Sequence, residues 1–182
     1  MSDIGYCIQC SDLVQSRHQI VQGEGNLRAK LMIIGEAPGE EEDLQGRPFV
    51  GRSGKLLNAT LAKLGVKRED IYITNVVKCR PPWNRRPNQL EIDNCEGYLQ
   101  EEIRLIAPRV IVTLGLSATN ALLEIPVSMG EANGKVFQYR ENIKLIPVYH
   151  PSAVLRNPNL RESFERGLKV AIEEAKKDEN IG

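Results

Sequence analysis

Four cysteines are the residues whose type and spacing most readily suggest chemistry in this chain of 182 residues. Cys7 and Cys10 form a Cys-x-x-Cys pair, whereas Cys79 and Cys95 stand apart along the chain. Thiolates bind zinc or the irons of an iron–sulfur cluster, and a zinc ribbon usually has two close pairs where this chain has one. The spacing therefore indicates a metal centre and leaves zinc and a cluster equally open. For Cys95 alone, burial as a small apolar residue is the alternative.

Three further segments have compositions that are unusual for plain loops. They are Gly-Glu-Ala-Pro-Gly at 35–39, Asn-Val-Val-Lys-Cys-Arg-Pro-Pro at 75–82 and His-Pro-Ser at 150–152. Each coincides with the end of a predicted strand. Because sites in parallel sheets form at the carboxyl ends of the strands, we expect the three segments to meet.

The elements that must position these segments can be predicted from the apolar pattern. β-Branched apolar runs predict buried strands at residues 30–35, 71–77, 109–115 and 143–149. Helical spacing joins Leu57 to Leu64, Ile92 to Ile106 and Phe164 to Ala175, and Ser117 could cap a short helix that runs to Leu123. This alternation predicts an α/β fold with a parallel sheet covered on both faces.

Composition limits the function without deciding it. The chain has 24 basic and 24 acidic residues, yet ten basic residues gather between Arg47 and Arg86. A local basic face can bind phosphate groups, although solvated loops would explain the same pattern. No apolar run is long enough for a membrane span, and residues 1–10 do not resemble a signal peptide, so we expect a cytoplasmic protein.

One apparent nucleotide-binding motif can be set aside. Residues 51–56 resemble the end of a phosphate-binding loop, but Phe49 occupies the position of its first glycine and Leu56 replaces the metal-binding hydroxyl residue.

Four segments in order resemble the family-4 uracil-DNA glycosylases: residues 35–43, 46–51, 74–82 and 150–156. The resemblance covers nearly the whole chain. It implies a DNA-repair hydrolase that releases uracil and leaves an abasic site. It further implies a single three-layer αβα domain over residues 1–182, around a four-stranded parallel sheet, and a [4Fe–4S] cluster on the four cysteines.

The resemblance also assigns roles in the site. Phe49 would stack on the flipped-out uracil. Asn75 could select uracil, because a carboxamide offers both a donor and an acceptor to the N3–H and O4 edge. His150 would donate to uracil O2 as negative charge develops there.

The residue that handles the water is left open. Some other uracil-DNA glycosylases have an aspartate where this chain has Ala37. Glu36 or Glu42 could hold the water, or Glu42 could block the methyl group of thymine. Glu36 and Ala37 are also expected to contact the base.

The expected partner is uracil-containing DNA, single- or double-stranded, bound by a monomer. Arg80, Arg85, Arg86 and Arg156 would contact phosphates, and Leu155 belongs to a segment that could wedge into the duplex. The rival hypothesis from another class is an iron–sulfur DNA-binding protein without catalysis. A hydrolase built on Ser152 and His150 is disfavoured, because these residues are too close along the chain.

Overall fold

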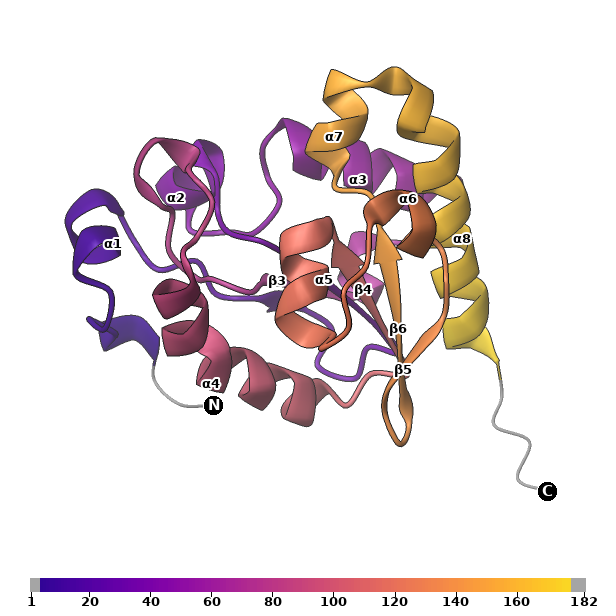
Figure 1. Cartoon of the computed structure of the whole chain (residues 1–182), viewed down its shortest axis with the longest axis horizontal. Coiled ribbons are helices and arrows are strands. Elements are labelled where there is room, and N and C mark those ends of the chain that lie inside the picture. The colour runs from indigo at the N-terminus through magenta and orange to yellow at the C-terminus, as the bar shows by residue number, and fades with distance from the viewer. Residues whose placement is uncertain (1–3, 178–182) are drawn as a thin grey trace.

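The computed structural model describes residues 4–177 and arranges them around one sheet of six strands (Figure 1). The strand order is β1-β3-β2-β4-β6-β5. Residues 1–3 and 178–182 of the predicted domain lie outside the described residues. The strands are β1 (Glu24–Gly25), β2 (Leu31–Gly35), β3 (Tyr72–Asn75), β4 (Val110–Leu114), β5 (Phe137–Arg140) and β6 (Ile143–Val148).

The prediction of a four-stranded parallel sheet is correct for the centre and wrong for the edges. The four predicted strands are β3, β2, β4 and β6, and they pair in parallel. β1 and β5 add antiparallel edges, so the sheet is mixed. β1 has only two residues and no apolar run, and β5 is half-buried on one face and exposed on the other. Neither carries the continuous apolar signal by which the central strands were predicted.

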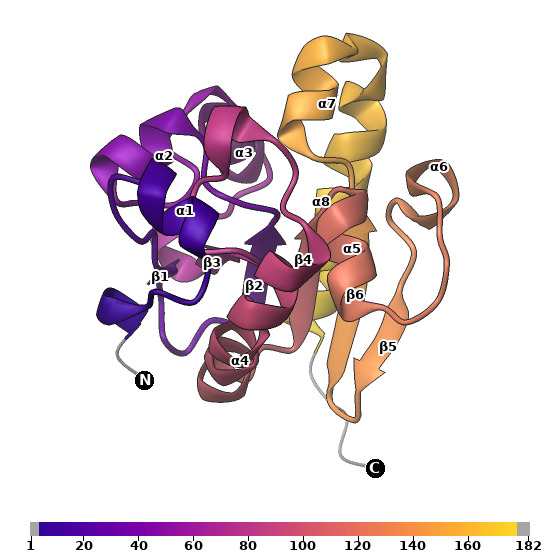
Figure 2. The same cartoon turned by 60° about the vertical axis from the view of Figure 1, so that its left-hand side comes forward.

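Helices cover both faces of the sheet, as the alternation predicted (Figure 2). One correction concerns the short helix after β4, for which Ser117 was the predicted cap: the helix spans Leu116–Leu122 with Gly115 as its N-cap, so Ser117 lies inside it. The helices are α1 (Ser11–Ser16), α2 (Glu40–Gln45), α3 (Arg52–Lys63), α4 (Gln89–Ile106), α5 (Leu116–Leu122), α6 (Met129–Ala132), α7 (Pro151–Arg156) and α8 (Arg161–Lys176), with 3-10 turns η1 (Ile4–Tyr6), η2 (Arg68–Asp70), η3 (Pro82–Asn84) and η4 (Pro158–Leu160).

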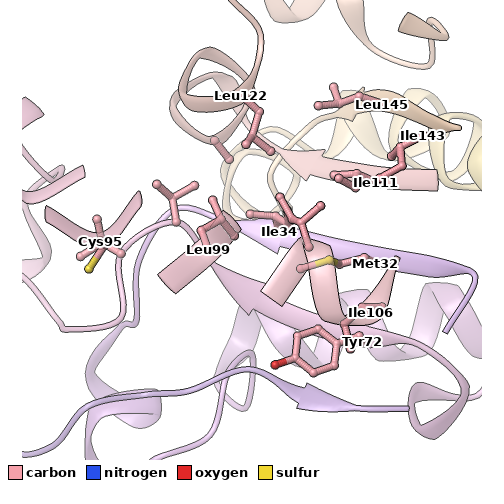
Figure 3. Packing of buried hydrophobic residues seen from close by; sticks show 14 of the residues in the cluster. Met32, Ile34, Tyr72, Cys95, Leu99, Ile106, Ile111, Leu122, Ile143 and Leu145 are labelled. Atoms are coloured by element: carbon pink, nitrogen blue, oxygen red, sulfur yellow. The ribbon is translucent and has the colours of Figure 1, made fainter. Parts of the chain in front are cut away.

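The sheet separates two hydrophobic cores. In the first, alternate strand residues such as Met32, Ile34 and Ile111 pack against Leu99 of α4 and Leu122 of α5 (Figure 3). In the second, their neighbours along the strands pack against the apolar faces of α3, α7 and α8. Because successive side chains of a strand point to opposite faces, each central strand contributes to both cores. The sheet is therefore held rigidly between two helical layers.

This rigid sheet directs four strand ends to one edge. β2, β3, β4 and β6 run parallel, so Gly35, Asn75, Leu114 and Val148 end them on the same side. In Figure 1, β6 points toward α7 at that side. Within residues 4–177, no helix is long and apolar enough to cross a membrane.

Candidate active site

A cleft of about 640 Å³ opens at the carboxyl ends of the parallel strands. It brings together residues from all three unusual segments, as their positions predicted. Its predicted site residues are Glu36, Ala37, Glu42, Phe49, Asn75, Arg86, His150 and Arg156.

Asn75 and Phe49 meet at the floor of this cleft. Asn75 is 2% exposed, and its Oδ1 is the buried side-chain atom that lacks a hydrogen-bond partner within residues 4–177. Phe49 is also buried. Both side chains lie against Gly35, where a Cβ atom would overlap the Phe49 ring and the Asn75 Oδ1 atom. Gly35 therefore makes room for an aromatic ring and an unsatisfied amide oxygen side by side.

The loop that carries Phe49 is held in an unfavourable backbone conformation. Phe49 has a φ of 52°, a region that residues with side chains rarely adopt. Arg68 Nη1 donates to the Phe49 carbonyl at 2.7 Å, and Nη2 donates to the Pro48 carbonyl. Gly54 allows the same Phe49 carbonyl to approach α3, since a Cβ there would collide with it. This packing explains the glycine of the discarded nucleotide motif.

Glu42 holds the other side of the same loop. Its Oε2 accepts the N–H groups of Val50 and Gly51 at 2.9 and 2.6 Å, and its Oε1 accepts the N–H of Gly39 at 3.1 Å. The carboxylate is thus committed to three backbone donors.

Glu36 differs from Glu42 in its surroundings. It lines the cleft and is partly exposed, and within the described chain its carboxylate has no hydrogen-bond partner. Ala37 lies beside it in the cleft wall. Of the two predicted carboxylates, Glu36 is therefore the one free to hold a water molecule or substrate.

His150 stands between β6 and α7, with a fixed ring orientation. Its Nδ1 accepts the N–H of Ser152 at 3.0 Å, and its ring centroid lies 6.0 Å from that of Phe49. Burial, and secondarily the positive charge of Arg156, lowers the pKa of His150 to about 4. The imidazole is therefore neutral near pH 7. Because Nδ1 is the acceptor, the ring proton resides on Nε2.

The five predicted DNA contacts have different surroundings. Arg86 and Arg156 are exposed and line the cleft, and Leu155 is exposed on α7. Arg80 donates to Asn84 Oδ1 at 2.7 Å. Arg85 makes a two-point ion pair with buried Glu91, at 2.7 and 2.9 Å. Arg86 and Arg156 are thus the cations best placed at the rim.

The cysteines come from three separate parts of the fold. Cys7 and Cys10 precede α1, Cys79 follows β3, and Cys95 lies on α4 at the margin of the first core (Figure 3). Arg17 joins two of these parts, because it donates to the Cys7 carbonyl at 2.8 Å and to Cys79 Sγ at 3.1 Å.

Asn94 joins α4 to the N-terminal segment in the same way. It donates to the Gln9 carbonyl at 3.3 Å and to Cys10 Sγ at 3.5 Å. Burial raises the pKa of Cys79, and it raises that of Cys95 to about 11; the charge of Cys10 contributes to both. Cys79 and Cys95 therefore both lie within electrostatic reach of Cys10.

The chemistry of the four cysteines fits an iron–sulfur cluster better than the distances between their side chains do. Within residues 4–177, no three Cys, His, Asp or Glu side chains are close enough to form a ready metal site. The four donors are nevertheless all thiols, without a histidine or carboxylate among them, which is the ligand set of a [4Fe–4S] cluster as well as of a Cys₄ zinc site.

Sequence patterns did not reveal several residues that shape the site. Arg68 lies 19 residues beyond Phe49, in a 3-10 turn with no motif of its own. The carboxylate of Asp43 is fully buried. It accepts the backbone N–H of His18 at 2.8 Å and also pairs with the His18 ring. These two contacts anchor the N-terminal segment to α2. A charged side chain in a 3-10 turn or a short helix gives no local signal of such a distant partner.

Comparison with known proteins identifies the class. The family model of the uracil DNA glycosylase superfamily matches residues 22–173, and the chain belongs to this superfamily.

Its relatives narrow the class further. The type-4 uracil-DNA glycosylases of Pyrobaculum aerophilum and Archaeoglobus fulgidus are 46% and 43% identical to it, over 90% and 92% of this chain and 87% of each relative. That of Thermotoga maritima is 44% identical over 93% of this chain and 88% of its own length. The chain is thus a member of the type-4 family, and the resemblance drawn from its motifs is confirmed.

Proposed function

We propose that this protein is a uracil-DNA glycosylase that hydrolyses the N-glycosidic bond of deoxyuridine in DNA. The observation that carries the proposal is the unpartnered Oδ1 of buried Asn75, beside Phe49 and in the cleft that His150 also lines. An unsatisfied buried acceptor costs about 1–3 kcal/mol, so it is expected to have a partner when the protein works. The names of the type-4 relatives support the same activity.

Base recognition follows from this pair of residues. A base inside a duplex is out of reach, so the nucleotide must flip into the cleft. Asn75 Oδ1 would accept the uracil N3–H, while its amide group donates to O4. Cytosine presents an acceptor at N3 and a donor at position 4, so the same amide opposes it. The Phe49 ring would stack on the base, with Glu36 and Ala37 in the wall of the cleft.

Bond cleavage uses the neutral His150. As the bond between C1′ and N1 breaks, its electron pair moves onto the base and negative charge develops at O2. His150 Nε2–H donates to that oxygen, and the interaction strengthens only as the charge appears. Water then adds to C1′, and the proton that it releases balances the one taken up by the uracil anion, which yields free uracil and an abasic site. Glu36 would hold this water, since Glu42 is occupied by backbone donors.

The four cysteines would hold a [4Fe–4S] cluster. The cluster would supply cross-links between the N-terminal segment, the end of β3 and α4. Because Asn75 ends β3 four residues before Cys79, this tie would also steady the strand end that recognises the base. Metal binding of this kind contributes folding free energy directly.

We further propose that the protein acts inside the cell on uracil-containing DNA. Arg86 and Arg156 at the rim would contact phosphates on either side of the flipped nucleotide, and Leu155 would fill the gap that it leaves.

The decisive experiment uses oligonucleotides that differ at one base. The protein is incubated with DNA containing uracil, cytosine or thymine at the same position, and alkali-labile sites and released base are measured. We expect uracil release alone. Specific binding to the uracil strand without an alkali-labile site would instead favour the non-catalytic iron–sulfur DNA-binding protein.

A further inference from the structure

Trp83 is the most exposed large apolar side chain within residues 4–177. It is 95% exposed and lies in η3, between β3 and α4. Its φ is 57°, and the next residue, Asn84, has a φ of 55°. Two successive residues with side chains in this region are costly, and such strain persists only where the surroundings impose it.

Hydrogen bonds around Trp83 impose this strained backbone conformation. Asn84 N–H donates to the Pro81 carbonyl at 3.1 Å, and Arg85 N–H donates to the Pro82 carbonyl at 3.1 Å, so two hydrogen bonds close the turn. The prolines restrict the backbone at its start. Arg80, which precedes the turn, donates from Nε to Asn84 Oδ1 at 2.7 Å and so fixes the Asn84 side chain.

Arg85 ties the end of this turn to the N-terminus of α4. Arg85 forms an ion pair with Glu91. Glu91 also belongs to the capping box of α4, in which the backbone N–H of Asn88 and that of Glu91 each donate to the other residue's side chain at 2.9 Å. The indole is therefore presented to solvent on a rigid support. An aromatic side chain on a fixed backbone has only two torsions of its own to order when it binds a partner.

The position of this support points to DNA. Asn84 and Arg86, on either side along the chain, line the same cleft as His150. Arg85 is neutralised by Glu91, while Arg80, held on Asn84, and exposed Arg86 remain as cations three residues before and three residues after Trp83. An exposed aromatic residue flanked by basic residues at the rim of such a cleft is suited to single-stranded nucleic acid, because the ring can stack on a base and the cations attract phosphates.

We propose that Trp83 is a stacking platform for an unpaired base of the bound strand, outside the uracil pocket. This inference rests on the proposed action on DNA and adds a second base-binding position to it. Because a base inside a duplex has no free face, the platform would increase affinity for single-stranded DNA more than for duplex DNA.

The test uses the full chain with its cluster and a single-stranded oligonucleotide without uracil. Trp83→Ala should weaken binding about 5- to 100-fold, the usual effect of removing one base–aromatic stack, and Trp83→Phe should restore most of it. Leu27→Ala is the matched control: Leu27 is 63% exposed in the loop before β2, at the opposite end of the strands, and its removal should change nothing.

Two further readouts separate stacking from catalysis. Trp83 is the only tryptophan in the chain, so its fluorescence should be quenched by the oligonucleotide and not by an equally charged polyanion without bases. For Trp83→Ala, the single-turnover rate of uracil release at saturating DNA should match that of the unaltered protein. Absence of uracil release would defeat the proposed function without affecting the binding measurement.

Unchanged affinity of Trp83→Ala for the single strand, with unquenched fluorescence, would overturn the inference and leave the indole as a contact for another protein. An equal loss of affinity for fully paired duplex DNA would also contradict it, because stacking requires an unpaired base.

Discussion

His150 Nδ1 accepts the backbone N–H of Ser152 at 3.0 Å, and this single hydrogen bond decides which ring nitrogen can donate. With Nδ1 occupied as an acceptor, the neutral imidazole carries its proton on Nε2. His150→Ala should therefore lower the single-turnover rate of uracil release about 100-fold, the low end of the effect of losing one such donor, with little change in DNA affinity. Lost affinity with a normal rate would make His150 a binding residue.

The pH profile tests the charge of the same ring. Because its pKa is lowered to about 4, the neutral form prevails above that pH, and the contribution of His150 should stay constant from about pH 5 to 8. A required imidazolium would instead lose activity tenfold per unit of pH above its pKa. The chain contains only two histidines, so NMR titration of the imidazole signals checks the pKa directly.

Asn75→Asp should reduce uracil release and weaken the preference for uracil over cytosine. The carboxylate cannot donate to O4 and would repel it, and a charge at a position that is 2% exposed is costly unless protonated. Excision of both bases should be measured together with thermal unfolding. Uracil release at the rate of the unaltered protein would remove Asn75 from base recognition.

Glu36 and Glu42 should respond oppositely to the same change. Glu42→Gln has one acceptor oxygen for three N–H groups, so the free energy of unfolding should fall by about 1–3 kcal/mol. Glu36→Gln should leave stability within about 0.5 kcal/mol but slow uracil release about 100-fold. Glu40→Gln, on the exposed face of α2, serves as control for both. A stable Glu42→Gln with a slow rate would reverse the two assignments.

Arg68→Ala should weaken base binding through the Phe49 loop. The change removes the donors to the Pro48 and Phe49 carbonyls, and we expect the Kd for free uracil to rise about tenfold and stability to fall by about 2 kcal/mol. Arg47→Ala is the matched control: Arg47 pairs with the same Glu24 but is exposed, so its loss should cost less than about 1 kcal/mol. In a Phe49→Ala background, Arg68→Ala should have no further effect on uracil affinity.

The cysteines should bind iron and sulfide in the purified protein. Anaerobic preparations should be brown, with absorption near roughly 400 nm. Cys95→Ser should lose iron and much of the thermal stability, because the tie between α4 and the N-terminal segment is lost. A colourless, zinc-loaded protein of normal stability would contradict the cluster.

Local sequence determined the central strands and the long helices of this protein. The strand that ends at Gly35 is a continuous apolar run, the one that ends at Asn75 is fully buried, and α4 has apolar residues at helical spacing, so each pattern follows directly from burial. The positions of Asn75 and His150 at strand ends were predictable for the same reason, since parallel strands end at one edge.

Tertiary structure alone decided how those residues are held. Arg68 reaches the Phe49 carbonyl across 19 residues, and buried Asp43 holds His18 across 25, so no local period or motif encodes either contact. The tautomer of His150 depends on a backbone N–H that is free only because α7 begins at Pro151. Helices and strands follow from periodic burial, which is a local property of the chain. Hydrogen bonds between distant side chains and backbone atoms depend on how those elements pack, and only the folded molecule specifies that.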